Sequence, residues 1–232
     1  MKNFVIFKNA RTGSSNLVLA INKNPSAFCY PEILNDYSQS NLSISEHINQ
    51  KLSNKKENDI LGFSINPFRK PKLDINFWNF SANNEKYVFL LTRDIFEQTI
   101  SRCLSVLTSS WPASKTSKNA NEIIGLVQSG LTIDVSLFER LLISNIKHKK
   151  GTEEFAKDFA KKNEVSTENL DYATLYGENK SDLNKLNNIL GLQLIEQNFN
   201  IENKLLPPDA STFIHNFEEL IKIKENMNDN IL

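Results

Sequence analysis

The chain is short of cysteine and of long apolar runs. Its 232 residues include only two cysteines, Cys29 and Cys103, too few for a disulfide framework or a cysteine-based zinc site. No apolar stretch approaches the roughly 18 residues that span a membrane. The apolar run at residues 4–7 continues into Lys8 without the pattern of a signal peptide. These absences predict a cytoplasmic protein with two buried thiols, no metal and no integral membrane segment.

An excess of charge of one sign is also missing. The chain carries 27 basic and 27 acidic side chains, so its formal net charge is zero. Proteins that bind nucleic acid through its phosphates usually show a basic excess, and the balance therefore argues against a nucleic-acid partner. Only 7 glycines stand beside 31 asparagines, a bias that makes any single asparagine weak evidence for function.

The order of apolar and polar segments predicts the fold class. Short apolar runs predict strands at residues 4–7, 27–30, 60–65, 87–92 and 170–175. Helical periodicity follows them, with Asp134 and Ser181 as predicted N-caps, Gly191 as a C-terminal stop and a last helix at about 217–226. Alternating strands and helices predict an α/β fold with a P-loop-like central parallel β-sheet flanked by helices. We expect a single domain over 1–232, with a mostly helical insertion or lid at about 108–165.

The loop after the first predicted strand has the composition of an anion site. It contains, in order, Arg11, Thr12, Gly13, Ser14, Ser15 and Asn16. The N–H groups and dipole of a helix N-terminus attract anions, and the guanidinium adds forked donors. A simple N-cap by one of the hydroxyls is the alternative. A Walker A motif has Lys after its second Gly, whereas Ser14 follows Gly13, which makes ATP phosphoryl transfer the weaker interpretation.

Two further residues follow predicted strands. Glu32 comes after the second strand, and Arg93 after the fourth. Because ligands of parallel sheets bind beyond the carboxyl ends of the strands, we expect both at the edge that carries the anion loop. A carboxylate there is a candidate general base, and the alternative for Glu32 is a solvated turn residue. The histidines at 47, 148 and 215 do not cluster, and we expect each at the surface.

The motifs at residues 11–17, Pro31-Glu32 and Arg93-Asp94 together resemble sulfotransferases, most closely the bacterial carbohydrate enzymes of the trehalose sulfotransferase type. In that family the first loop cradles the 5′-phosphosulfate of 3′-phosphoadenosine 5′-phosphosulfate (PAPS). An Arg-Asp at a strand end, with Ser eight residues after the Arg, binds the 3′-phosphate. Ser101 stands at that spacing from Arg93. The chain departs from the family's frequent pattern at Ser64 and Ile95, where the family often has Lys and Pro.

The resemblance implies a PAPS-dependent sulfotransferase that acts on a carbohydrate or other small hydroxyl acceptor and releases 3′-phosphoadenosine 5′-phosphate (PAP), without a metal. It assigns Glu32 and Arg11 to catalysis. The residues that it assigns to the nucleotide are Arg11, Thr12, Gly13, Ser14, Ser15, Asn16, Arg93 and Ser101. A nucleotide-dependent kinase and a non-catalytic nucleotide-binding protein of the same fold are the alternatives. The sequence leaves open the acceptor, the pathway and whether the chain forms a homo-oligomer.

Residues outside these motifs are weaker candidates. Trp111 is a candidate to stack on a sugar ring or to anchor a lid, and Lys204 to contact the nucleotide. Arg69 and Lys70 are candidates for an anionic acceptor, although a solvated basic turn is the simpler interpretation.

Overall fold

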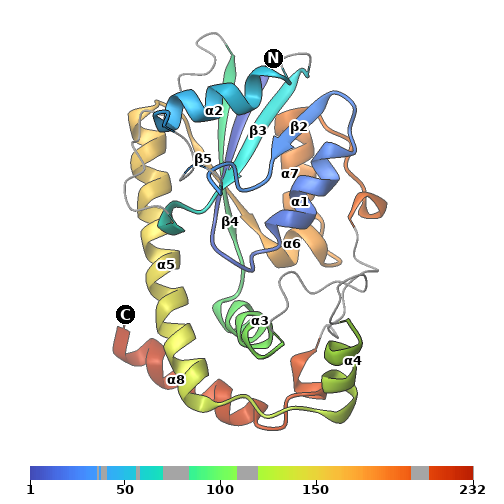
Figure 1. Cartoon of the computed structure of the whole chain (residues 1–232), viewed down its shortest axis with the longest axis vertical. Coiled ribbons are helices and arrows are strands. Elements are labelled where there is room, and N and C mark those ends of the chain that lie inside the picture. Colours follow the sequence, from blue (N-terminus) through green and yellow to red (C-terminus); the bar gives the residue numbers. More distant parts are fainter. Residues whose placement is uncertain are drawn as a thin grey trace. The chain divides into compact units, whose positions relative to one another are not determined.

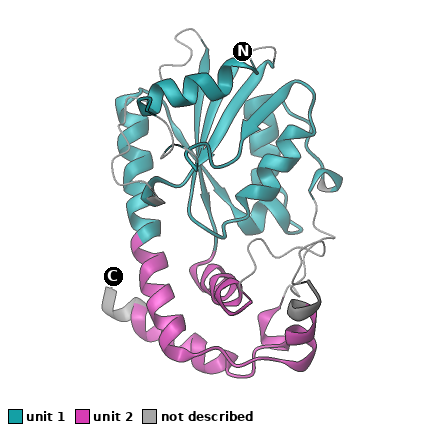
Figure 2. Ribbon diagram, in the orientation of Figure 1, with its two compact units in different colours: residues 1–93, 148–199 teal, residues 94–147, 200–232 magenta. Residues whose placement is uncertain are grey.

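The computed structural model describes residues 1–35, 37, 41–55, 58–69, 84–108, 120–199 and 209–231. The chain divides into two compact units (Figure 2). Residues 1–93 and 148–199 form the first unit, and residues 94–147 and 200–232 form the second. The sheet lies in the first unit. The expected single domain with an insertion at about 108–165 stays a prediction.

Within the described residues, five parallel strands form the sheet of the first unit (Figure 1). They are β1 (Lys2–Lys8), β2 (Ala27–Tyr30), β3 (Ile60–Ile65), β4 (Glu85–Thr92) and β5 (Thr167–Asp171). Their order across the sheet is β2-β3-β1-β4-β5. The predicted α/β fold with a central parallel sheet is confirmed, and every strand ends at the same edge.

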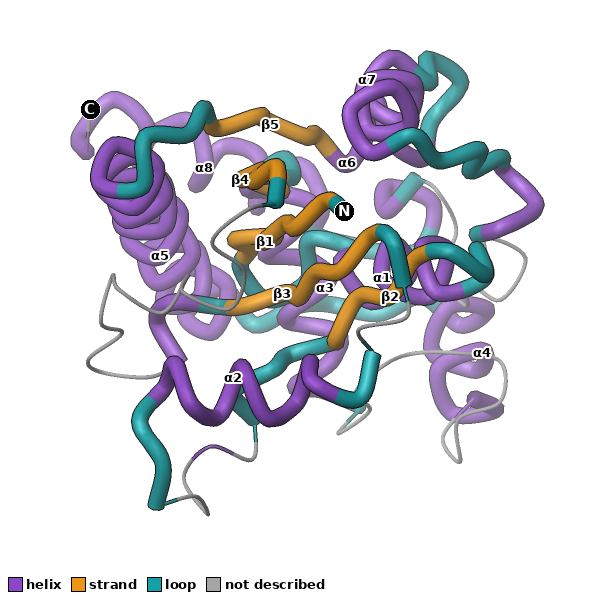
Figure 3. The backbone as a smooth tube through the Cα atoms, turned by 90° about the horizontal axis from the view of Figure 1, so that it is seen from above, coloured by secondary structure: helices purple, strands orange, loops and turns teal. Residues whose placement is uncertain are grey.

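Helices cover both faces of this sheet. Figure 3 shows α1 (Ser14–Asn22), α6 (Tyr172–Tyr176) and α7 (Ser181–Leu190) on one side. On the other side lie α2 (Ile44–Ser53) and the C-terminal part of α5 (Val135–Lys162). A short 3₁₀ turn, η2 (Pro67–Arg69), follows β3, and η3 (Glu196–Asn198) follows α7. Both faces of the sheet are therefore shielded from solvent, as parallel sheets require.

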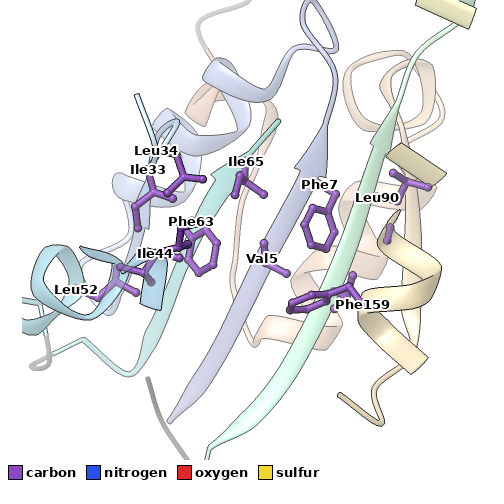
Figure 4. Packing of buried hydrophobic residues seen from close by; sticks show 13 residues of the cluster. Val5, Phe7, Ile33, Leu34, Ile44, Leu52, Phe63, Ile65, Leu90 and Phe159 are labelled. Atoms are coloured by element: carbon purple, nitrogen blue, oxygen red, sulfur yellow. The ribbon is translucent and has the colours of Figure 1, made fainter. Parts of the chain in front are cut away.

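Apolar side chains on alternate positions of the strands build the core between the sheet and its α2–α5 side (Figure 4). Phe7 of β1 packs edge to face against Phe159 of α5, with ring centroids 5.2 Å apart. The described members of this cluster are Val5, Phe7, Ile33, Leu34, Ile44, Ile48, Leu52, Phe63, Ile65, Val88, Leu90, Ala156 and Phe159. On the opposite face, Phe4 and Phe89 pack edge to face at 6.1 Å. Buried apolar side chains therefore pack on both faces of the strands whose ends form the carboxyl edge of the sheet.

The strand order creates a switch point between β1 and β4. From β1 the chain continues to β2 on one side of it, whereas from β4 it continues to β5 on the other side. β1 and β4 are direct neighbours in the sheet. In open α/β sheets, ligands bind in the crevice at such a reversal, beyond the carboxyl ends of the strands. The topology therefore predicts a ligand site at the residues that follow these two strands.

The second unit is helical in its described residues. It contains α3 (Ile95–Leu107), α4 (Ala120–Ser129), the first part of α5, the 3₁₀ turn η5 (Ala210–Thr212) and α8 (Phe217–Ile231). Its core includes Phe96, Phe138 and Leu220. The carboxylate of Asp134 accepts the N–H of Leu137 at 2.7 Å, so the predicted cap of this helix is confirmed. None of the described helices is long and apolar enough to cross a membrane.

Two details of the predicted elements are wrong. The last strand ends at Asp171 instead of residue 175, because the Asp171 carboxylate accepts the N–H of Ala173 at 2.8 Å and caps α6. Ser181 is the first residue of α7 and not its cap, since Lys180 occupies the cap position. Gly191 ends that helix as predicted, in a left-handed conformation with φ 76°.

Candidate functional site

The loop between β1 and α1 presents the start of a helix at the carboxyl edge. Gly13 is the N-cap, with φ 84°, and no side chain caps the helix. Thr12 is buried, and its hydroxyl donates to the carbonyl of Asn9 at 3.0 Å. The hydroxyls therefore do not form a simple N-cap. Ser14 and Ser15 open α1, where N–H groups have no acceptor within the helix.

Among the predicted loop residues, exposure falls into three classes. Thr12 and Ser14 are buried, Ser15 is exposed, and Arg11, Gly13 and Asn16 are half-buried. The Asn16 N–H donates to the Gly13 carbonyl at 3.1 Å. Ser15 is therefore the exposed residue among these six.

Two tyrosines of α6 fix the position of Gly13. The hydroxyl of Tyr176 donates to the Gly13 carbonyl at 2.9 Å. A Cβ atom at Gly13 would lie 2.6 Å from Cε2 of Tyr172, too close for any other residue without movement of the ring. Burial raises the pKa of Tyr176, which stays a neutral donor. The sequence pointed to neither role, because the segment from Tyr172 looked like a strand.

Arg11 and Arg93 come together at the switch point. The Nη1 of Arg93 donates to the Arg11 carbonyl at 3.3 Å, and its guanidinium lies 4.2 Å from the centre of the Tyr172 ring. Burial, and then the charge of Arg93, lowers the pKa of Arg11, while Tyr172 raises it. Two neighbouring cations repel each other, and an anion bound beside both would offset this cost. The site is therefore suited to a multiply charged anion.

Backbone strain marks two of the predicted residues. Among the described residues other than glycine, positive φ occurs at Arg11 (68°), Glu32 (46°) and Glu164 (54°). Such conformations cost about 1–3 kcal/mol each and concentrate at functional sites. Arg11 and Glu32 follow β1 and β2, so both lie at the carboxyl edge. Glu164 lies between α5 and β5, before the start of a strand.

Glu32 is held by an ion pair. Lys8 is the last residue of β1, and its ammonium donates an N–H to Oε1 of Glu32. The side chain of Lys8 is only 5% exposed and that of Glu32 25%, so Glu32 is not a solvated turn residue. The Glu32 N–H donates to the hydroxyl of Ser64 at 3.0 Å. The sequence reasoning missed Lys8, although a lysine directly after the apolar run at residues 4–7 was a usable signal.

His47 supports the same turn from α2. Its Nε2 hydrogen-bonds the carbonyl of Ile33 at 3.0 Å, and its side chain is buried. The expectation that His47 lies at the surface is wrong, because its ring packs against Tyr37 on the side of α2 that faces the sheet. His148 is half-buried, and His215 is exposed.

The side chains of the remaining candidates lie either in the second unit or outside the described residues. Ser101 is buried on α3, in the second unit, and its grouping with Arg93 stays a prediction. Trp111, Lys70 and Lys204 lie outside the described residues, as does the side chain of Arg69. Within the described part of the chain, no group of three or more His, Cys, Asp or Glu side chains is arranged to hold a metal ion.

Comparisons with known proteins give structural similarities only. No family model and no curated protein matches the chain. The sulfotransferase domain of the olefin synthase from Synechococcus PCC 7002 is 12% identical over 98% of this chain and 94% of that chain, with a TM-score of 0.46. The sulfotransferase domain of the curacin biosynthetic pathway is 14% identical over 98% and 89%, with a TM-score of 0.46. Mouse sulfotransferase SULT7A1, complexed with PAP, is 11% identical over 84% and 60%, with a TM-score of 0.41. Similarities of this size are too low to assign the chain to a family.

Proposed function

We propose that the chain is a PAPS-dependent sulfotransferase that moves a sulfuryl group to a hydroxyl of a carbohydrate or other small acceptor. The observation that carries the proposal is the meeting of Arg11 and Arg93 beside the N-terminus of α1, at the ends of neighbouring strands. PAPS is anionic at its 3′-phosphate and at its 5′-phosphosulfate. Cations and helical N–H groups at one sheet edge match that pattern of charge.

The donor-binding residues divide into two groups. Arg11 and the backbone N–H groups from Gly13 to Ser15 bind the 5′-phosphosulfate, with Thr12 and Asn16 supporting the loop. Arg93, steadied by Tyr172, binds the 3′-phosphate together with Ser101. The order of these two motifs along the chain and their resemblance to those of sulfotransferases support this division.

Glu32 acts as the general base. The acceptor oxygen attacks sulfur in line and forms a new S–O bond, while the bond from sulfur to the bridging oxygen breaks. The acceptor proton passes to the Glu32 carboxylate, and the bridging oxygen leaves with the bonding electron pair on the 5′-phosphate of PAP. Arg11 neutralises that charge as it develops. A base of this kind contributes about 10²–10⁴-fold to the rate.

A thermal-shift comparison of PAP with ATP-Mg tests the class of ligand. We expect PAP to give the larger rise in melting temperature, because the proposed site fits its two phosphates and the loop lacks the Walker A lysine of ATP-binding proteins. A ligand at 100 times its Kd stabilises a protein by about 2.7 kcal/mol. A larger rise with ATP-Mg would overturn the proposal in favour of a kinase. Arg93→Met should remove most of the PAP effect, whereas Arg140→Met, a substitution of an exposed arginine on α5, should not.

Substitution of Glu32 by glutamine separates an enzyme from a binding protein. Incubation with PAPS and a panel of sugars and small alcohols, read by mass spectrometry, should show transfer by the native chain. Glu32→Gln should lower turnover about 10²-fold or more and leave PAP affinity within twofold. Glu164→Gln is the matched control, because Glu164 is also a glutamate with positive φ but is exposed. Full transfer by Glu32→Gln would remove Glu32 as the base, and PAP binding without transfer by the native chain would indicate a non-catalytic protein.

A further inference from the structure

We propose that Lys8 is the positioning residue for the catalytic carboxylate: its buried ammonium holds one oxygen of Glu32 in place. This inference rests on the sulfotransferase function proposed above and adds to the site the last residue of β1. Lys8 lies outside the loop motif, and its partner is 24 residues away in the sequence.

Because its ammonium is buried, Lys8 needs a counter-charge nearby. Its side chain is 5% exposed, and an ammonium removed from water to that extent is costly unless a counter-charge lies beside it. The carboxylate of Glu32 supplies that charge. The side chain of Lys8 starts from a fixed point, because β1 pairs with β3 on one side and with β4 on the other. The ammonium therefore has a defined position.

The backbone on the Glu32 side is equally well fixed. The hydroxyl and the carbonyl of Ser64, on β3, accept the N–H groups of Glu32 at 3.0 Å and of Ile33 at 3.3 Å. His47 holds the Ile33 carbonyl from α2. These contacts set the main chain of the turn but leave the glutamate side chain to be placed. Lys8 places it by binding Oε1, and we assign the acceptor proton to Oε2.

Glu32 is a charged partner of Lys8, whereas the nearby thiol of Cys29 is not. Cys29 of β2 also interacts electrostatically with Lys8, but burial raises the pKa of its thiol far more than Lys8 lowers it. Cys29 is therefore neutral. An ammonium beside a carboxylate favours the ionised form of the acid, which is the form that accepts a proton from the acceptor hydroxyl.

A kinetic double-mutant cycle tests this role in the full-length chain. Lys8→Met should lower kcat for transfer from PAPS about 10- to 100-fold, with PAP affinity within twofold. The variant with both Lys8→Met and Glu32→Gln should be no slower than Glu32→Gln alone, because Lys8 acts through Glu32. Lys8→Ala should regain part of its kcat when propylammonium, but not propionamide, is added. Multiplied losses in the double variant, or equal rescue by both additives, would overturn the proposal.

A stability cycle on the same variants needs no activity. Each single substitution should lower the melting temperature, Glu32→Gln by about 6 °C or more, since it leaves the buried ammonium of Lys8 without its partner. The double variant should lose clearly less than the sum of the two. Strictly additive losses would overturn the pairing even if the enzyme transfers sulfate. Coupled losses in a chain that transfers nothing from PAPS would instead overturn the sulfotransferase function and the catalytic role of Lys8.

Discussion

Single residues at the site adopt backbone conformations that few side chains tolerate. Arg11, Gly13 and Glu32 all have positive φ, which disfavours residues with a Cβ atom. At Gly13 the same conformation coincides with close approach of the Tyr172 ring. The guanidinium of Arg93 lies over that ring, so the shape of the loop and the position of the second arginine depend on one another.

Gly13→Ala should therefore impair the loop and the arginine together. The new Cβ would lie 2.6 Å from Tyr172 Cε2 at φ 84°, and the ring must move to accept it. We expect PAP affinity, measured by titration calorimetry, to fall about tenfold or more, and stability to fall by about 1–3 kcal/mol.

Gly125→Ala serves as the control, because a Cβ atom there meets nothing within 4 Å. It lies in α4, where alanine is favoured over glycine by about 1 kcal/mol, so stability should be unchanged or higher. Native PAP affinity in Gly13→Ala would show that the Tyr172 contact does not position the loop.

Aspartates cap the two helices that directly follow β4 and β5 in the chain. Asp94 accepts the N–H groups of Phe96 at 2.9 Å and Glu97 at 3.0 Å at the start of α3, and Asp171 caps α6 in the same way. In each case a strand end is converted into a helix start within one or two residues. The aspartate of the Arg-Asp motif is thus a structural residue in this chain, and the arginine beside it is the candidate for ligand contact.

Asp94→Ala should destabilise the protein by about 1 kcal/mol, the usual cost of losing an N-cap. Asp94→Asn keeps the capping oxygen and should retain most of the stability in urea unfolding. Both variants should bind PAP within about twofold of the native chain if they remain folded. A tenfold loss of affinity in Asp94→Asn at native stability would contradict the capping role and indicate that the carboxylate contacts the nucleotide.

Across the whole molecule, net charge is balanced while several titratable groups are buried. Burial raises the pKa of Cys29 and of Tyr176, and raises that of Cys103 to about 12. In the unfolded chain the thiols release their protons near pH 8.5, and the tyrosine near pH 10, by about the usual values. Between those values and the folded ones, the unfolded state binds fewer protons than the folded state.

Stability should therefore fall as pH rises above about 8.5, by up to about 1.4 kcal/mol per pH unit for each buried thiol and more once tyrosine titrates. Below that pH the contribution of these groups is complete. Urea unfolding at pH 8, 9 and 10 measures the slope. A variant with Cys29→Ala and Cys103→Ala should show a clearly smaller slope from pH 8.5 to 10, and a flat profile in the native chain would contradict the burial of the thiols.

The sequence predicted most of the fold because buried parallel strands carry dense local signals. The run at residues 60–65 matches β3 residue for residue, and the loop from Arg11 to Asn16 lies where the strand-to-helix transition was expected. The misses have long-range causes. The pairing of Lys8 with Glu32 and the burial of His47 depend on which strands become neighbours. No periodicity within one segment contains that information.

The left-handed backbone at Arg11 and Glu32 limits which substitutions the protein can accept at these two positions. Libraries that randomise either codon would consist mostly of strained clones, since β-branched and bulky replacements are the least tolerated at φ 68° and 46°. Asparagine and glycine are the substitutions that such a backbone accepts with least penalty. Diversity for laboratory evolution is better introduced at neighbouring positions with ordinary dihedral angles, leaving these two codons fixed.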